Sequence, residues 1–477
     1  MKVLEGRRFV RKTKIVCTLG PASSGIREIS QLAHAGMDVV RLNFSHGTPR
    51  EHRRNIQKIR KVSADLGRPL AILQDLGGPK IRLGELPGKG IRLVPGGRVR
   101  LVGDRDRKAP VGIPVSTPAV LETVRAGDPV LLGDGQIELR VEKVRAGEVL
   151  CGVVTGGLLT SRKGITLPTR SIPLPAFTDK DRNDLIAGLD SGVDFVALSF
   201  VRDAADIRSV KSFLAERGAA DLPVIAKIEK HEALENLESI LAEADGIMVA
   251  RGDLGVEIPL EEVPLVQKNL VLQANRVGKP AIIATQMLRS MVESPRPTRA
   301  EALDVANAVL DGADAVMLSE ETAVGRYPAQ AVRFMARLAA RAETLLDRSR
   351  EPDPSFPSIP EGIGYAACRL ARDLDAKAIL APTRSGITAR AVSRFRPAQG
   401  VLAFSPDPAV VRRLCLLWGV TPRRVPRLQD TDDLIRRVCE FARSEGGLQS
   451  GDLVVIVAGV PTGDPGSTNL LQVARLP

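Results

Sequence analysis

One repeating unit organises most of this chain and limits what it can fold into. A short apolar or β-branched run is followed by a stretch with amphipathic helical spacing, as at 26–35 and 232–242. The runs span 14–20, 39–45, 70–76, 193–200, 223–229, 246–254, 280–287 and 314–321. Strand–helix units repeated eight times predict a closed (β/α)₈ TIM barrel.

Two segments depart from this repeat. Residues 78–172 are rich in Gly, Val, Arg and Pro and alternate apolar with polar positions, which predicts a small antiparallel β-barrel domain inserted in a barrel loop. A Pro-rich stretch at 351–360 leads into a new α/β pattern, which predicts a separate C-terminal α/β domain. We therefore predict a discontinuous barrel of residues 1–77 and 173–345, an inserted domain at 78–172 and a C-terminal domain at 346–477.

Composition narrows the class of protein. The five cysteines are scattered and form no CxxC pair, which argues against a disulfide framework or a zinc site and predicts a reducing, cytoplasmic location. The N-terminus lacks the apolar region of a signal peptide, and no apolar run approaches the ~18 residues of a membrane span. A net charge of +12 with only 3% aromatic residues favours small anionic ligands over nucleic acid.

Several catalytic classes have no support in the sequence. There is no HExxH, GxSxG or strand–GxGxxG–helix motif, and residues 84–89 lack the Ser/Thr of a phosphate-binding loop. The four histidines suggest no metal cluster. Dehydrogenase, P-loop and serine-hydrolase activities are therefore not expected.

Polar residues gather where the predicted strands end. In such barrels the carboxyl ends of the strands carry the chemistry, whereas the interior is filled by Val, Ile and Leu. The polar residues at these ends are Arg41, Asn43, Ser45, Asp75, Lys227, Glu229, Arg251, Asp253 and Thr285, with Lys80 and Arg82 shortly after the third strand. A lone charge there is ordinarily a surface residue and a lone carboxylate a helix cap. Five polar strand ends together predict an active site.

The residue types at this mouth indicate the reaction class. Glu229 and Asp253 offer hard oxygen ligands for Mg²⁺, with room left for water and substrate. Arg41, Arg82 and Lys227 supply positive charge for a phosphate group. With no His or Cys nucleophile, the site suits direct phosphoryl transfer, in which catalysis is mostly positioning and charge neutralisation.

Motifs along essentially the whole chain resemble pyruvate kinase. The matching strings are RLNFSHG at 41–47, GPKIR at 78–82, KGITLP at 163–168, AKIE at 226–229, DGIMVARGDLG at 245–255, ATQML at 284–288 and MLSEETAVGRYP at 317–328, with TRSGITA at 383–389 and GSTN at 466–469. The resemblance implies phosphoryl transfer from phosphoenolpyruvate to ADP, giving pyruvate and ATP. It also implies Mg²⁺ or Mn²⁺ as cofactor, the inserted domain as a lid, a regulatory C-terminal domain and a homotetramer.

The resemblance also implies roles for individual residues. Lys227 would neutralise the transferring phosphoryl group and stabilise the enolate, Arg41 and Arg82 would contact that group, and Thr285 would position the proton. The remaining implied sets are Glu229 and Asp253 for Mg²⁺; the backbone of Ala250, Arg251, Gly252 and Asp253 for the substrate carboxylate; Arg41, His46, Pro21 and Lys163 for the nucleotide; and Asn43, Ser45, Asp75 and Leu76 for a monovalent cation.

Departures from the family pattern bear on the monovalent cation. Leu76-Gly77 stand where Thr-Lys is usual, and Lys80 replaces a Glu. The Lys80 ammonium group can bring a positive charge to the place of the ion, so we expect no K⁺ requirement. The alternative is that Lys80 turns to solvent and K⁺ still binds. Thr166 for Asn and Glu320 for Gly leave the Mg²⁺ ligands and Lys227 untouched.

A second anion site is expected in the C-terminal domain. Thr383, Ser385, Gly386 and Thr388 lie where a predicted strand ends and a helix begins. Hydroxyls and free N–H groups at a helix N-terminus bind phosphate, so a phosphorylated sugar or a nucleotide monophosphate is the expected effector. Simple helix capping is the alternative.

Two other functional classes stay open at this point. A Mg²⁺-dependent lyase or aldolase acting on pyruvate enolate could use Glu229, Asp253 and Arg41 in a similar barrel, but it would not need a lid or a nucleotide. A non-catalytic anion-binding regulator would not need Lys227 and both carboxylates. Dependence on ADP separates the first alternative from a kinase.

Overall fold

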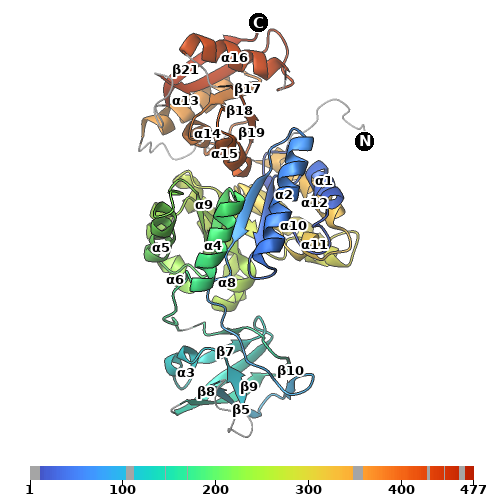
Figure 1. Ribbon diagram of the computed structural model, residues 1–477, viewed down its shortest axis with the longest axis vertical. Coiled ribbons are helices and arrows are strands. Elements are labelled where there is room, and N and C mark those ends of the chain that lie inside the picture. The colour runs from blue at the N-terminus through green and yellow to red at the C-terminus, as the bar shows by residue number, and fades with distance from the viewer. Residues whose placement is uncertain are drawn as a thin grey trace.

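The computed structural model describes residues 11–103, 112–145, 147–168, 170–346, 358–426, 430–444, 446–460 and 468–477. Three bodies lie in a row along its long axis (Figure 1). The C-terminal domain is at one end, the barrel is in the middle and the inserted β domain is at the other end. No helix among these residues is long and apolar enough to cross a membrane.

The central body is the predicted closed barrel of parallel strands. Its order is β1-β16-β15-β14-β13-β12-β3-β2, and β2 closes back on β1. The strands are β1 (Lys14–Thr18), β2 (Val39–Asn43), β3 (Ala71–Asp75), β12 (Phe195–Leu198), β13 (Val224–Ile228), β14 (Gly246–Ala250), β15 (Ala281–Ala284) and β16 (Ala315–Leu318). Each lies inside one of the eight runs picked out from the sequence, so the fold prediction is confirmed.

Helices surround the barrel and bury their apolar faces against it. They are α1 (Ile26–Ala35), α2 (Pro49–Asp65), α4 (Asp179–Ser191), α5 (Ala204–Ala215), α6 (His231–Glu235), α7 (Leu237–Glu243), α8 (Arg251–Glu257), α9 (Val263–Arg276), α10 (Arg299–Leu310), α11 (Glu320–Ala323) and α12 (Pro328–Ala342). Capping boxes begin three of them, through Thr48 in α2, Thr178 in α4 and Thr298 in α10.

An aspartate repeats at the start of every second barrel strand. Asp38, Asp194, Asp245 and Asp314 directly precede β2, β12, β14 and β16. Each accepts the N–H of a residue on the preceding strand of the barrel, and its own N–H donates to the carbonyl of that same residue. The residues paired in this way are Ile15, Ile72, Val224 and Ala281. These exchanges tie neighbouring strands together at the amino end of the barrel, opposite the predicted active site.

The inserted domain is built on a six-stranded sheet of order β11-β7-β8-β9-β5-β6 and a two-stranded sheet of β4 and β10. Its elements are β4 (Ile91–Leu93), β5 (Arg98–Gly103), β6 (Ile113–Val115), α3 (Ala119–Thr123), β7 (Pro129–Leu132), β8 (Ile137–Arg145), β9 (Glu148–Thr155), β10 (Gly157–Leu159) and β11 (Ile165–Thr166). The bridges Arg82–Gly164 and Leu83–Val115 connect the two edges of the larger sheet. Strand pairs are antiparallel as expected, except that β6 runs parallel to β5.

The C-terminal domain has a five-stranded sheet of order β19-β18-β17-β20-β21. Its elements are α13 (Ile359–Asp373), β17 (Ala378–Pro382), α14 (Ile387–Ser393), β18 (Gly400–Ser405), α15 (Pro408–Arg413), β19 (Val420–Arg424), α16 (Thr431–Ser444), β20 (Leu453–Gly459) and β21 (Thr468–Arg475). The sequence pattern did not reveal β19 or β21. Most of the Pro-rich stretch lies outside the described residues, and the division of the chain at 77/78, 172/173 and 345/346 stays a prediction.

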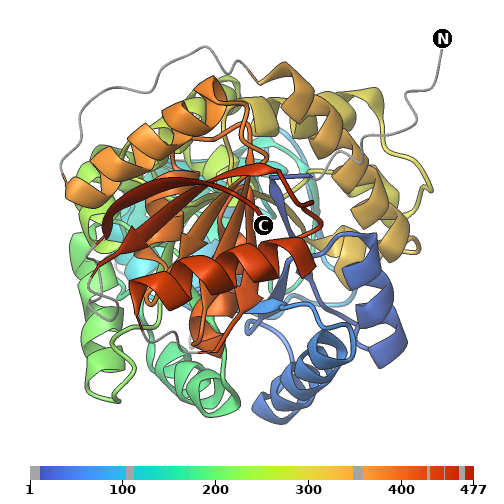
Figure 2. The ribbon, with the colours of Figure 1, turned by 90° about the horizontal axis from the view of Figure 1, so that it is seen from above.

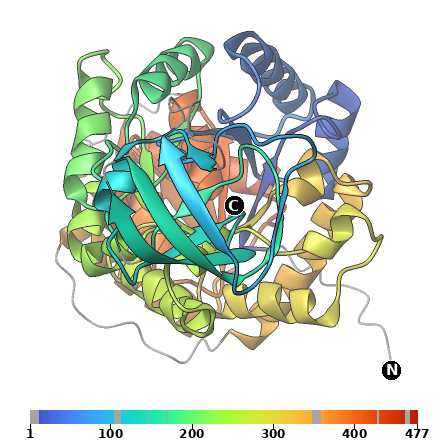
Figure 3. The same cartoon turned by 90° about the horizontal axis from the view of Figure 1, so that it is seen from below.

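The C-terminal domain covers the amino ends of the barrel strands (Figure 2). Cys415 and Leu416 pack into the apolar core inside the barrel. Two arginines of this domain hold two of the repeated aspartates: Arg412 lies 2.6 Å from Asp194, and Arg396 lies 2.8 Å from Asp314. The opposite mouth, at the carboxyl ends of the strands, faces the inserted domain (Figure 3).

We expect replacement of a fully buried member of the four repeated aspartates to destabilise the fold markedly. The Asp194 side chain is 1% exposed and accepts from the Ile72 N–H, Arg60 and Arg412, so Asp194→Ala leaves three donors without their acceptor. The expected loss is about 3 kcal/mol in urea denaturation. Asp245, whose side chain is 36% exposed, provides the control: Asp245→Ala should cost about 1 kcal/mol. Equal losses in the two variants would contradict the prediction.

Candidate active site

Lys227 is the central charge of the mouth. It lies on β13 near its carboxyl end, and the residue is only 8% exposed. Its Nζ atom is 3.3 Å from Asp75 Oδ1 and 2.8 Å from Glu229 Oε1, and it donates to Ser199 Oγ at 2.7 Å. Burial disfavours the ammonium ion, but the Asp75 and Glu229 carboxylates outweigh that cost and raise the Lys227 pKa above its usual value. Lys227 therefore stays charged.

Asp75 joins two of the predicted catalytic cations. It ends β3 and is 1% exposed, and its Oδ2 atom accepts from Arg41 Nε at 2.6 Å. Burial alone would raise the Asp75 pKa, but the charges of Arg41 and Lys227 lower it below its usual value. Arg41 also donates to Thr18 Oγ1 at 3.0 Å. Arg41, Lys227 and Asp75 therefore form one connected group at the ends of β2, β13 and β3.

The two predicted Mg²⁺ ligands lie on neighbouring elements. Glu229 follows β13, is 1% exposed and accepts from the Phe200 N–H at 2.9 Å. Asp253 lies in the first turn of α8, directly after β14, and part of its side chain is exposed at the mouth. Water reaches part of the Asp253 side chain, so its carboxylate is only partly desolvated. Even this partial burial, together with the negative charge of Glu229, raises the Asp253 pKa to about 6. A divalent cation between the two carboxylates would relieve the repulsion that Glu229 exerts on Asp253.

Thr285 is held in an unusual backbone conformation at the end of β15. Its φ is +70°, which is rare for a β-branched residue, and Gln286 follows at +57°. Thr285 Oγ1 accepts from the Gly252 N–H at 2.8 Å and donates to the Ala284 carbonyl, while Arg251 donates to the Thr285 carbonyl at 2.8 Å. Strain of this kind gathers at functional sites, where surrounding bonds maintain it.

The residues predicted around the monovalent cation are only partly brought together. Asn43 lies opposite Asp75 in the β2–β3 register, and its Oδ1 atom accepts from the Ser45 N–H at 3.1 Å. Leu76 is buried, and its carbonyl accepts from Ser199 Oγ. Lys80 is exposed, and among the described residues it has no hydrogen bond or ion pair to this group. Partial burial and the positive charges of Lys227 and Arg82 lower the Lys80 pKa. The Lys80 ammonium group therefore lies close enough to the mouth to interact electrostatically with these two residues.

The predicted nucleotide residues lie around the rim of the mouth. Pro21 and His46 are exposed on loops after β1 and β2, whereas Lys163 is exposed on the inserted domain. Arg82, predicted to contact the transferring phosphoryl group, is also exposed on the inserted domain. Burial and the positive charges of Lys80 and Arg82 lower the His46 pKa. Arg82, on the inserted domain, therefore lies close enough to interact electrostatically with His46 on the barrel. No direct bond joins Arg82 or Lys163 to Arg41 or Lys227 among the described residues.

The predicted effector residues are at the junction of β17 and α14. Thr383 is buried, and its Oγ1 atom accepts from the Gly386 N–H at 2.9 Å, as a cap would. The Thr388 hydroxyl is paired with Thr468 at 2.8 Å, whereas Ser385 is exposed. Two of the three hydroxyls in this set thus already have partners in the protein.

Two groups near the predicted site were not expected from the sequence. Ser199 directly follows β12, near the end of the fourth apolar run, so the rule of polar strand ends could have found it. His231 lies beside Glu232 and Glu257, with ligand atoms of all three within 4.8 Å of one another, although the histidines suggested no metal cluster. No sequence signal links His231 to Glu257, because they come from different helices.

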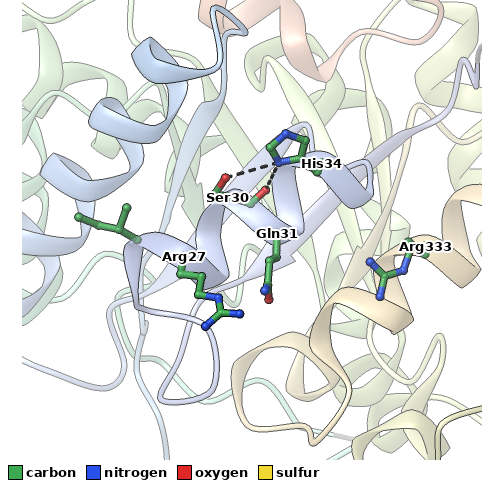
Figure 4. Close-up of a pocket in the computed structure, with 6 residues that line it drawn as sticks. Arg27, Ser30, Gln31, His34 and Arg333 are labelled. Atoms are coloured by element: carbon green, nitrogen blue, oxygen red, sulfur yellow. Dashed lines mark hydrogen bonds between the residues drawn. The ribbon is translucent and has the colours of Figure 1, made fainter.

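A groove of about 600 Å³ lies on the outer wall of the barrel, apart from this mouth (Figure 4). Arg27 and Gln31 of α1 and Arg333 of α12 border it. His34 Nδ1 is 2.8 Å from the Ser30 carbonyl within α1. None of the residues predicted for catalysis or binding lines this groove, so it is separate from the predicted active site.

Comparison with known proteins agrees with this geometry. Residues 10–332 match the family described as "Pyruvate kinase, barrel domain", and residues 361–474 match "Pyruvate kinase, alpha/beta domain". The chain belongs to the pyruvate kinase family. It is 47% identical over 474 residues to a pyruvate kinase of Mycobacterium tuberculosis, covering 98% of this chain and 99% of that protein. A pyruvate kinase of Geobacillus stearothermophilus is 46% identical over 469 residues, covering 97% of this chain and 80% of that protein.

A solved pyruvate kinase also shares the whole architecture. The crystal structure of the enzyme from Cryptosporidium parvum superposes with a TM-score of 0.92 at 38% identity, covering 98% of this chain and 96% of that one. The likeness therefore includes the inserted and C-terminal domains as well as the barrel.

We expect Ser199 to matter for turnover in this pyruvate kinase through its hydrogen bond to Lys227. Ser199→Ala removes one of three acceptors around the ammonium group, at 2.7 Å, and leaves both carboxylates. A bond to a charged group is worth about 1.5–3 kcal/mol, so kcat should fall at least about tenfold, with little change in KM for ADP. Ser209→Ala, at an exposed position on α5, is the control. An unchanged kcat in Ser199→Ala would show that the carboxylates alone position Lys227.

Proposed function

We propose that this pyruvate kinase transfers the phosphoryl group of phosphoenolpyruvate to ADP, giving pyruvate and ATP, with Lys227 as the central catalytic group. The observation that carries the proposal is a buried ammonium group kept charged by Asp75 and Glu229 at the barrel mouth, with Arg41 fixed beside it. Preorganised positive charge at the place of phosphoryl transfer is what this reaction requires.

Each group then has a task that its position supports. Lys227 and Arg41 face the transferring phosphoryl group, and Lys227 also stabilises the enolate oxygen as pyruvate forms. The substrate carboxylate lies against the backbone of residues 250–253. The Gly252 N–H already donates to Thr285, so the other amides of that turn serve it. Thr285, held by Gly252 and Arg251, positions the proton that converts the enolate to pyruvate.

Glu229 and Asp253 would hold Mg²⁺ or Mn²⁺, which neutralises phosphoryl charge when bound. Their carboxylate oxygens suit a hard cation, because burial and the charge of Glu229, which together raise the pKa of Asp253, both disfavour a carboxylate without a positive partner. The Phe200 N–H and Lys227 already hold the two oxygens of Glu229 in place.

The inserted domain is proposed to close over the nucleotide and exclude water. Gly78, at the start of the insertion, has a φ of +61°, and its N–H donates to Asp181 at the start of α4. Arg82 and Lys163 would then reach the phosphates from the lid, and His46 and Pro21 from the barrel side. A pyruvate-enolate lyase or aldolase would turn over without ADP, so a strict ADP requirement decides between the two activities.

Assembly and location are proposed on separate grounds. Leu265 and Leu272 of α9 and Leu303 and Leu310 of α10 are exposed, and the two helices adjoin through Lys268 and Asp311. This apolar surface supports self-association as a homotetramer. All five cysteines carry free thiols, which supports a reducing, cytoplasmic location.

Activity should depend on the metal and on Lys227. Purified protein should make pyruvate and ATP from phosphoenolpyruvate and ADP when Mg²⁺ or Mn²⁺ is present, and chelation should abolish turnover. Lys227→Met should lower kcat by about 10²–10³-fold, as expected for loss of one transition-state charge donor. Near wild-type kcat in Lys227→Met would refute the role proposed for this residue.

We propose that the enzyme needs no K⁺, because Lys80 supplies charge near Asn43, Ser45 and Asp75. Two unit charges 4 Å apart repel by roughly 4 kcal/mol at an effective dielectric near 20, so the ammonium group and K⁺ compete. Rates in K⁺ and in a tetraalkylammonium salt at fixed ionic strength should be equal, and Lys80→Glu should create a K⁺ requirement. Several-fold activation of the unmodified enzyme by K⁺ would end this proposal.

We propose that a phosphorylated sugar or nucleotide monophosphate binds at the β17–α14 junction and activates the enzyme. Ser385 is exposed there, and Gly386 with a φ of +92° opens α14. The double variant Thr383→Ala and Ser385→Ala should lose activation without losing basal activity. If activation survives the double substitution, the effector binds elsewhere.

A further inference from the structure

Helix α8 is a seven-residue segment that carries Asp253 and the proposed binding backbone. Its amino end is anchored to the end of β15. Arg251 donates to the Thr285 carbonyl at 2.8 Å and to Asp304 at 2.6 Å, and the Gly252 N–H donates to Thr285 Oγ1. One end of the segment is therefore fixed on the side away from Glu229.

The other end of α8 is anchored by Glu257. Glu257 is the last residue of the helix, and its side chain is 4% exposed. Its Oε1 atom accepts from Lys230 Nζ at 2.5 Å, and its Oε2 atom is 3.1 Å from His231 Nδ1. Lys230 and His231 directly follow Glu229 in the chain. Glu257 therefore connects the segment that bears Asp253 to the segment that bears Glu229.

We propose that Glu257 is a positioning residue that fixes the separation of Glu229 and Asp253 and so sets affinity and selectivity for the divalent cation. This inference rests on the proposed role of those two carboxylates. Asp253 lies four residues, about one helical turn, before Glu257, so the clamp acts on it through a rigid segment. Groups that orient metal ligands typically change metal affinity by about 10–100-fold when removed.

The alternative use of the same cluster is a second metal site at His231, Glu232 and Glu257. The three ligand atoms lie within 4.8 Å, and both Glu232 oxygens are buried without a hydrogen-bond partner among the described residues. However, the Lys230 ammonium group already lies against Glu257 and supplies the positive charge that a cation would bring. The geometry therefore favours an internal clamp over a second ion.

The test measures cation binding directly as well as turnover. Mn²⁺ is titrated into the full-length enzyme, with free Mn²⁺ followed by electron paramagnetic resonance, and Ca²⁺ and Mg²⁺ are measured by competition. Glu257→Gln should raise the Kd for Mn²⁺ about tenfold at unchanged stoichiometry. It should weaken Mg²⁺ more than Ca²⁺, because Mg²⁺ demands near-ideal octahedral geometry and Ca²⁺ tolerates a looser site. If Glu257 only stabilises the fold, Glu257→Gln will lower the melting temperature and leave the Kd for Mn²⁺ of the folded enzyme unchanged.

Matched variants keep the outcomes separate. Glu261→Gln, at an exposed position on the 3₁₀ turn Leu260–Glu262, should leave the Kd unchanged. Lys230→Met removes one half of the clamp, so it should raise the Kd for Mn²⁺ by a smaller factor. It provides the test if Glu257→Gln fails to fold. Asp253→Asn tests the proposed function itself.

Each result decides something. If Asp253→Asn weakens Mn²⁺ but neither clamp variant does, Glu257 has no positioning role and the proposed function stands. If Asp253→Asn leaves Mn²⁺ binding intact, the proposed metal site and this inference fall together. Two Mn²⁺ ions per chain, with only the weaker one lost in Glu257→Gln, would replace the clamp by a second metal site.

Discussion

The proposed active site of this pyruvate kinase is built around a lysine that must remain charged while buried. Removing an ammonium group from water is costly, and only opposite charge at short range offsets that cost. Asp75 and Glu229 supply it for Lys227, and Asp75 fixes Arg41 at the same time. The carboxylates are themselves buried, so each member of the group needs the others. Positive charge is thereby held in place before substrate arrives, which is the arrangement that phosphoryl transfer uses.

The opposite end of the barrel is organised by carboxylates with a different task. Four aspartates at the starts of alternate strands accept N–H groups that closed-barrel geometry leaves at the strand ends. Two of them, Asp194 and Asp314, also hold arginines of the C-terminal domain. Strand β12 joins the two ends: Asp194 precedes it, and Ser199 and Phe200 beyond it contact Lys227 and Glu229. The docking surface of the C-terminal domain and the proposed active site are thus connected by one short, buried strand.

Much of the fold could be predicted because periodicity is a local property. Strand and helix periods identified all eight barrel strands, and turn residues marked the insertion. Strands β19 and β21 were missed, since β19 contains Pro422 and charged residues, and β21 is an edge strand whose exposed positions weaken any apolar run. The parallel pairing of β5 with β6 could not be predicted either, because pairing direction depends on the path of the chain between strands rather than on their composition.

By itself, the sequence determined which residues are polar at the ends of buried strands, and hence that Arg41, Lys227, Glu229 and Asp253 belong to one mouth. Only the tertiary structure decided which charges meet. Asp75 became the shared partner of Arg41 and Lys227, and Glu257 the partner of Lys230 and His231, because closure and register of the barrel set distances across the mouth. Alternation along a strand specifies a face but no distance, and the energy of a buried ion depends on the distance to its partner.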